Sequence, residues 1–147
     1  MGQSYHALWV HLVWGTKYRQ PTITKELKFR LFSKLREIAK EKGYHLDFIN
    51  GVEDHVHLLV ALHPSCSIAE VVKNLKGISH IWVRDNQLSD QYFHWQDGYA
   101  AISVSPGRVS IVRNYIRNQE QRHSRQSFKK EWAELRKHAI EIRNDGF

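Results

Sequence analysis

Two histidines one residue apart are the first candidates for chemistry in this chain. His55 and His57 lie near the start of Glu53–Leu62, where a polar entry leads into an apolar run. This pattern is typical of a buried strand, and side chains two positions apart on a strand point to the same face. Two imidazoles on one face can bind a metal ion, although two histidines hydrogen-bonded within a sheet would have the same spacing.

A tyrosine and a glutamine four residues apart are the second candidates. Tyr115 and Gln119 lie in a stretch with helical periodicity, where positions i and i+4 are neighbours on one face. Tyrosine can form a covalent phosphoester, and a carboxamide can add an oxygen ligand to the two nitrogens of His55 and His57. Such a set suits Mg²⁺ or Mn²⁺, and imidazole also accepts Zn²⁺, Co²⁺ or Ni²⁺. A buried aromatic residue and a polar residue on the helix surface would give the same spacing.

Basic residues accompany these candidates. The chain carries 22 Lys and Arg against 15 Asp and Glu, a net charge of +7, which favours nucleic acid as a partner and an anionic membrane surface second. We predict DNA contacts on a basic loop, on the second helix and along the tyrosine helix, at Lys17, Arg19, Lys73, Lys76, Arg108 and Arg122. Solvated surface positions are the alternative for each of them.

Length and composition describe an ordinary globular chain. The 147 residues are 41% hydrophobic and 25% charged, which predicts one domain covering 1–147. A single cysteine, Cys66, excludes an internal disulfide and a cysteine-rich zinc site. No apolar run approaches the ~20 residues that span a bilayer, and the N-terminus lacks the organisation of a signal peptide. We therefore expect a cytoplasmic protein without membrane segments.

The elements that must position the candidates follow from hydrophobic periodicity. We expect strands at 5–14, 44–49, 53–62 and 99–104, and helices at 24–42, from Ser67, at 105–121 and from Ser127. The turn-forming pair Asn50–Gly51 predicts antiparallel pairing of the second strand with the histidine strand. This order predicts an α+β fold of the ferredoxin-like (split βαβ) type, with helices on one face of an antiparallel sheet and C-terminal helices that carry the tyrosine.

Two short motifs resemble those of a known family. Asp54-His55-Val56-His57-Leu58, followed by Tyr115-Ile116-Arg117-Asn118-Gln119, is similar to the motifs of single-tyrosine HUH transposases. These are the insertion-sequence 200/605-type enzymes and their relatives associated with repetitive palindromes. The resemblance covers nearly the whole chain, including the opening His11–Arg19 and the segment His94–Tyr99.

The resemblance implies a specific reaction. In such enzymes two histidines and the glutamine bind a divalent metal, and the tyrosine attacks single-stranded DNA to leave a 5′-phosphotyrosine link and a free 3′-hydroxyl. Carried over, His55, His57 and Gln119 are the metal ligands and Tyr115 is the nucleophile. The resemblance also implies recognition of DNA hairpins and a homodimer.

Two other functions remain open at this point. A domesticated relative would bind single-stranded DNA or RNA on the same sheet without cutting it, and a relaxase or replication initiator would nick DNA with the same histidine pair. A covalent adduct with DNA distinguishes the enzymes from the binding protein, and strand-transfer products distinguish the transposase from the nicking enzyme.

Overall fold

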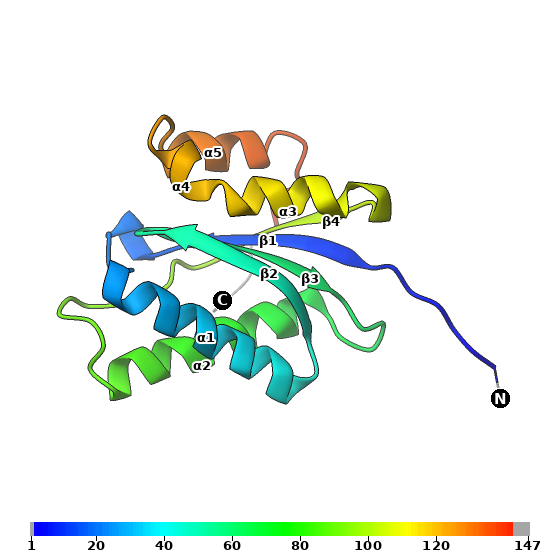
Figure 1. Ribbon diagram of the computed structural model, residues 1–147, viewed down its shortest axis with the longest axis horizontal. Coiled ribbons are helices and arrows are strands. Elements are labelled where there is room, and N and C mark those ends of the chain that lie inside the picture. The colour runs from blue at the N-terminus through cyan, green and yellow to red at the C-terminus, as the bar shows by residue number, and fades with distance from the viewer. Residues whose placement is uncertain (1, 143–147) are drawn as a thin grey trace.

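One four-stranded antiparallel sheet separates two layers of helices (Figure 1). The computed structural model describes residues 2–142, so Met1 and residues 143–147 of the predicted domain lie outside the described residues. The strands are β1 (Trp9–Gly15), β2 (His45–Val52), β3 (His55–Ala61) and β4 (Ala100–Val104). The helices are α1 (Lys25–Lys42), α2 (Ile68–Asp85), α3 (Val109–Arg117), α4 (Gln119–His123) and α5 (Phe128–Leu135), with 3₁₀ turns η1 (Lys17–Arg19) and η2 (Pro106–Arg108).

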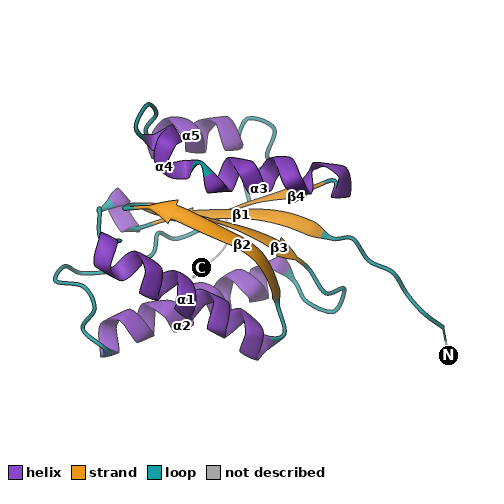
Figure 2. Ribbon diagram, in the orientation of Figure 1, coloured by secondary structure: helices purple, strands orange, loops and turns teal. Residues whose placement is uncertain are grey.

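The strand order confirms the predicted topology. The strands run β2-β3-β1-β4, so β1 and the histidine strand β3 are the central pair. Figure 2 shows α1 and α2 together on one face of this sheet and α3, α4 and α5 on the other. The α+β, ferredoxin-like arrangement is therefore present, and the tyrosine-bearing helices cover the face that α1 and α2 leave free.

Local capping explains why α1 begins and ends, and why α2 begins, where the sequence predicts. The Thr24 side chain accepts a hydrogen bond from the Leu27 amide, and Gly43 ends α1 with a left-handed φ of 77°. The Ser67 side chain caps α2 in the same way by accepting from the Glu70 amide. These signals are local, which is why they can be identified without the rest of the chain.

The predicted turn at Asn50–Gly51 is wrong, although the predicted antiparallel pairing of β2 with β3 is confirmed. Both residues belong to β2, where Asn50 pairs with His57 and Gly51 with Val56, and the turn lies at residues 53–54. Gly51 serves a close approach rather than a turn, because a Cβ there would overlap the carbonyl oxygen of His55. The Asn50 amide donates to the Ile116 and Arg117 carbonyls and so ties β2 to the end of α3.

Two other boundaries differ from the predictions. The first strand begins at Trp9 rather than residue 5, and the predicted helix over 105–121 is divided into η2, α3 and α4. Asn118 separates α3 from α4, so Tyr115 and Gln119 lie on two short helices instead of one. Within residues 2–142, no helix combines the length and the apolar character that crossing a membrane requires.

Candidate metal and tyrosine site

Strand alternation directs the two histidines away from the main hydrophobic core. Val56, Leu58 and Val60 pack against α1 and α2, whereas His55 and His57 point to the opposite face, beneath α3–α5. Both histidine side chains are completely buried. The site therefore lies between the sheet and the layer that carries the tyrosine.

The outer nitrogens of the two imidazoles have partners that fix their orientation. His55 Nδ1 lies 2.7 Å from Asp54 Oδ1, and because a carboxylate only accepts, this nitrogen carries a hydrogen and donates it. His57 Nδ1 lies 2.8 Å from Nε2 of His11 on the neighbouring strand β1. A hydrogen on His57 Nδ1 satisfies this contact and leaves Nε2 of both His55 and His57 free to act as a ligand.

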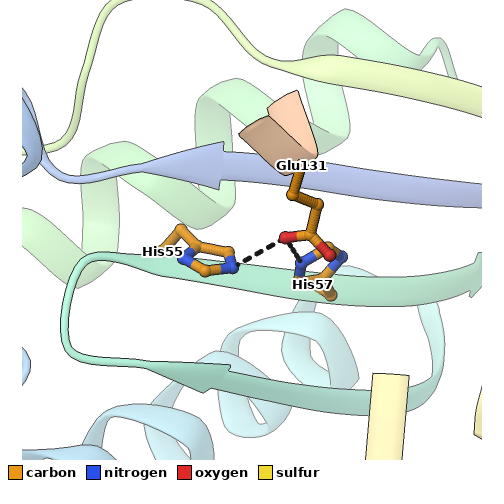
Figure 3. A group of neighbouring side chains, drawn as sticks. All are labelled: His55, His57 and Glu131. Atoms are coloured by element: carbon orange, nitrogen blue, oxygen red, sulfur yellow. Dashed lines mark hydrogen bonds and ion pairs between the residues drawn. The ribbon is translucent and has the colours of Figure 1, made fainter. Parts of the chain in front are cut away.

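Glu131 of α5 lies between the two histidines (Figure 3). Its Oε1 atom is 3.1 Å from His55 Nε2 and 3.1 Å from His57 Nε2, and its side chain is fully buried. The Ser127 side chain caps α5 by accepting from the Lys130 amide and so sets the start of the helix that carries this carboxylate. The donor atoms of the three residues all lie within 4.8 Å of one another.

Gln119 and His123 complete the cluster from α4. Gln119 Oε1 is 3.1 Å from His55 Nε2, and its Nε2 donates to Glu131 Oε2 at 3.0 Å. His123 Nδ1 donates to the carbonyl of Gln126, and its Nε2 is 3.0 Å from Gln119 Oε1 and 2.9 Å from Glu131 Oε1.

This convergence of acceptors calls for a cation. With the outer hydrogens placed on His55 and His57, two nitrogen lone pairs, an amide oxygen and a carboxylate oxygen face one another about 3 Å apart. Acceptors so close repel unless a proton or a metal ion lies among them, and buried charge must be compensated. The residues present therefore fit a divalent metal ion with mixed nitrogen and oxygen ligands.

Tyr115 reaches the same carboxylate from α3. Its hydroxyl donates to Glu131 Oε2, and its ring meets the imidazoles of His57 and His11 edge-on, with centroids 5.7 and 5.9 Å away. The Arg122 guanidinium lies 4.4 Å from the centre of the tyrosine ring. Burial, followed by the hydrogen bond to Glu131 and its negative charge, raises the pKa of the phenol, and Arg122 opposes this rise.

Burial and charge give the imidazoles different pKa values. Burial lowers the pKa of His57 to about 4, with Glu131 partly offsetting the effect, and it lowers the pKa of His11 to about 3, with His57 adding to the effect. Burial would also lower the pKa of His55, but hydrogen bonds to Asp54 and Glu131 outweigh it and raise that pKa. For Glu131, burial favours the neutral acid, but the contacts with His55 and His57 lower its pKa, so the carboxylate is ionised.

The predicted DNA contacts divide into two groups. Arg122 lies beside the tyrosine, the exposed Arg19 in η1 lies 5.9 Å from the ring of Phe128 on α5, and Lys17 is half-buried next to Arg19. Arg108 is exposed in η2, at the start of the tyrosine layer. Lys73 and Lys76 belong to α2, on the far side of the sheet (Figure 1).

The prediction for Lys76 is wrong. Its side chain is buried, and its ammonium donates to the carbonyls of Gln96 and Gly98 at 2.7 and 2.9 Å. Burial lowers its pKa to about 8. The amphipathic pattern of α2 could not indicate this, because the two carbonyls belong to a loop 20 and 22 residues farther along the chain.

Four residues of the site were missing from the predicted set, namely His11, Asp54, His123 and Glu131. Asp54 belongs to the histidine motif but was given no role there. Glu131 had a detectable signal, because it lies three residues after Phe128 on the predicted apolar side of the last helix, where an acid needs a partner. His11 had a weaker one, since its neighbours on β1 are apolar. His123 had none that distinguishes it from the other histidines of the chain.

Comparison with known sequences identifies relatives over most of the chain. A sequence model of the family described as "Transposase IS200 like" matches residues 4–119. The ISDra2 transposase TnpA of Deinococcus radiodurans is 32% identical over 124 residues, which are 80% of this chain and 89% of that protein. The transposase for insertion sequence element IS200 of Salmonella typhimurium is 27% identical over 123 residues, 78% of this chain and 80% of that protein.

Solved structures share the fold. A crystal structure described as that of a transposase from Deinococcus radiodurans has a TM-score of 0.65 at 32% identity and covers 81% of this chain and 96% of that one. A REP-associated tyrosine transposase bound to a REP hairpin has a TM-score of 0.59 at 12% identity, covering 84% of this chain and 74% of that one. At 12% identity the second likeness concerns the fold alone.

Proposed function

The chain belongs to the family of IS200-like transposases, and from that premise we propose that it cleaves and rejoins single-stranded DNA through a covalent bond between Tyr115 and a 5′-phosphate. The observation that carries the proposal is the convergence of Tyr115, His55 and His57 on one buried carboxylate, that of Glu131. A nucleophile and a set of metal donors thus share one small space within a single chain.

In the protein without DNA, His55, His57 and Glu131, with Gln119 beside them, would hold the divalent metal. Mg²⁺ or Mn²⁺ suits the oxygen ligands, and when bound it supplies positive charge that stabilises the phosphate oxygens during displacement. Asp54 and His11 contribute by holding the outer nitrogens of the imidazoles, which keeps the inner nitrogens directed at the donor cluster.

Tyr115 acts as the nucleophile in this proposal. Its phenolic oxygen forms a bond to the scissile phosphorus, and the bond from phosphorus to the 3′ oxygen breaks. The strand that leaves carries a free 3′-hydroxyl, and the phosphate stays on the tyrosine as a 5′ link. The phenol loses its proton as it attacks, and the departing 3′ oxygen takes up a proton to become the hydroxyl. The reverse attack by a 3′-hydroxyl rejoins DNA.

Basic side chains provide a path for the DNA strand to the tyrosine. A hollow of about 360 Å³ is lined by Tyr115, Arg122 and Arg125, together with the polar side chains of Asn118, Gln121 and Gln126. We assign phosphate contacts to Arg122 in this hollow, to Arg19 beside Phe128 of α5 and its neighbour Lys17 in η1, and to Arg108 just before α3. Lys73 lies on the far layer and does not belong to this path.

Recognition of a DNA hairpin, the oligomeric state and the location belong to the same proposal. A structural relative is bound to a REP hairpin, which supports a DNA hairpin as the element recognised beside the cleavage site. A homodimer follows from the family resemblance, and a cytoplasmic location stays a prediction from the sequence. Because His55, His57 and Tyr115 meet within one chain, adduct formation should persist when the protein is diluted to the monomer.

Covalent capture of DNA tests the proposal. The protein, incubated with Mn²⁺ and a labelled single-stranded DNA that carries hairpins, should form an adduct that survives denaturing electrophoresis. Tyr115→Phe should reduce the adduct at least about 10³-fold while leaving DNA binding intact, and EDTA should abolish it. An adduct in the phenylalanine variant, or DNA binding without any adduct in the native protein, would contradict the assignment; the second result would favour a non-catalytic binding protein.

A further inference from the structure

The metal donors are sealed from solvent, and α5 is the element that seals them. His55, His57, Gln119 and Glu131 have no exposed surface, whereas Tyr115 is only partly buried and borders the hollow described above. A phosphate in that hollow can approach the tyrosine ring but cannot reach the donor cluster. The reaction of the proposed function requires one phosphate to contact both, so a part of this arrangement must move.

Glu131 occupies the place that such a phosphate needs. One carboxylate oxygen contacts Nε2 of His55 and His57, and the other accepts from the Tyr115 hydroxyl and the Gln119 amide. Through these contacts Glu131 bridges the metal donors and the nucleophile. A scissile phosphodiester has to bridge the same two groups. A carboxylate also resembles a phosphodiester in presenting two oxygens and one negative charge.

Phe128, one turn earlier on α5, occupies a position suited to a nucleobase. Its ring lies parallel to the His55 imidazole, with centroids 3.9 Å apart and 5° between the planes, and it packs over Gly15 of β1. The Arg19 guanidinium lies 5.9 Å from its centre. Stacking on an aromatic ring beside a guanidinium is how proteins hold unpaired bases.

The attachment of α5 to the protein is small. It is a helix of eight residues in which Phe128 and Glu131 are buried and Trp132 and Leu135 half-buried, while Lys129, Lys130, Ala133 and Glu134 face solvent. Short elements with few buried apolar contacts open at lower free energy than core elements. The helix also lies beyond residue 119, where the match to the family ends.

We propose that α5 mimics single-stranded DNA in the resting protein, with Glu131 in place of a phosphate and Phe128 in place of a base, and that the substrate strand displaces it. This inference rests on the proposed function, because it takes DNA as the competitor. A strand that binds must bring its own phosphate and base into the positions that α5 leaves. His55, His57 and Gln119 would then hold the metal, with a phosphate oxygen in place of the Glu131 carboxylate.

Hydrogen exchange on the full chain tests the displacement. In the Tyr115→Phe background with Mn²⁺, a single-stranded oligonucleotide with a hairpin should accelerate exchange of the amides of 128–135, while those of β3 stay protected. Unchanged or slower exchange in α5 with DNA bound would overturn the inference. That outcome is distinct from failure of the proposed function, which would appear as no adduct in the native protein.

A pair of variants on α5 provides the second measurement. Phe128→Ala, made in the same background, weakens the resting contact and should raise affinity for the oligonucleotide about tenfold. Ala133→Ser, on the exposed face of the same helix, should leave the affinity unchanged. Equal affinity in the two variants, or a lower affinity for Phe128→Ala in a protein that remains folded, would count against α5 as a competitor.

Discussion

The two faces of the sheet are buried by different kinds of contact. On the face covered by α1 and α2, one continuous apolar cluster includes Leu12, Trp14, Leu31 and Leu58. On the face covered by α3–α5, the apolar cluster is small, formed by Leu59, Val104, Val109 and Ile116, and it adjoins a buried network of histidines, Gln119 and Glu131. One side of each central strand therefore stabilises the fold, and the other positions charged and polar groups.

Two adjacent residues of β3 test the difference between the two faces of the sheet. Leu58→Ala should lower the free energy of unfolding by about 2–5 kcal/mol and leave affinity for Mn²⁺ unchanged, because the cavity forms on the α1–α2 face. His57→Ala should lower affinity for Mn²⁺ by more than about 100-fold. Urea unfolding and titration calorimetry measure the two effects, and equal loss of stability and of metal affinity in both variants would remove the distinction between the faces.

Acid should destabilise the protein through the histidine face. The pKa of His57 is about 4 in the folded chain against 6.5 when unfolded, so the unfolded state binds more protons between these values and stability falls as pH drops from 6.5 toward 4. His11 acts in the same direction. The loss should be about 3 kcal/mol for His57.

Urea unfolding in EDTA at a series of pH values measures this loss. The raised pKa of His55 does not oppose it, because below pH 6.5 that group is protonated in both states. Stability that stays constant from pH 6.5 to pH 4 would show that the buried histidines take up protons without unfolding.

Two glutamates on α5, one buried in the donor cluster and one exposed, test whether the buried carboxylate binds the metal. Glu131→Gln removes the buried carboxylate from the donor cluster and should lower affinity for Mn²⁺ about tenfold. Glu134→Gln makes the same chemical change on the exposed face and should have no effect. Calorimetry on both variants decides the point, and equal affinities would leave the metal to His55, His57 and Gln119 alone.

The smallest effect is expected for single cations on the surface, one beside α5 and one on α2. Arg19→Ala should weaken binding of single-stranded DNA about threefold and reduce its dependence on salt, because one phosphate contact is lost. Lys73→Ala removes the same charge from the far layer and should change neither. Fluorescence anisotropy across a range of salt concentrations measures both, and an equal loss in the two variants would place DNA on α2 as well.

The features that could be predicted from the sequence are those that depend on residues close together in the chain. The caps at Thr24, Gly43 and Ser67, the alternation that pairs His55 with His57, and the ferredoxin-like order of elements all follow from local pattern. Tyr115 and Gln119 were also identified, and the fold brings both to the histidines. Their chemical roles stay predictions.

What could not be predicted depends on partners distant in sequence. Asn50–Gly51 has the composition of a turn, but the α3 carbonyls that bind Asn50 lie 66 and 67 residues away. The site of Lys76 is set by a loop, and the carboxylate of Glu131 meets histidines more than 70 residues earlier in the chain. The break at Asn118 divides a helix whose periodicity continues across it. At Asn50 and Lys76 a tertiary contact overrides a sound local signal.

Gly51 has a consequence for genetics. Since the carbonyl of His55 fills the space where any larger side chain would begin, this position tolerates none of the other amino acids without displacing the strand that holds both imidazoles. A random mutagenesis screen for lost DNA rearrangement should therefore recover changes at this codon, although glycine has no functional group and takes part in no chemical step.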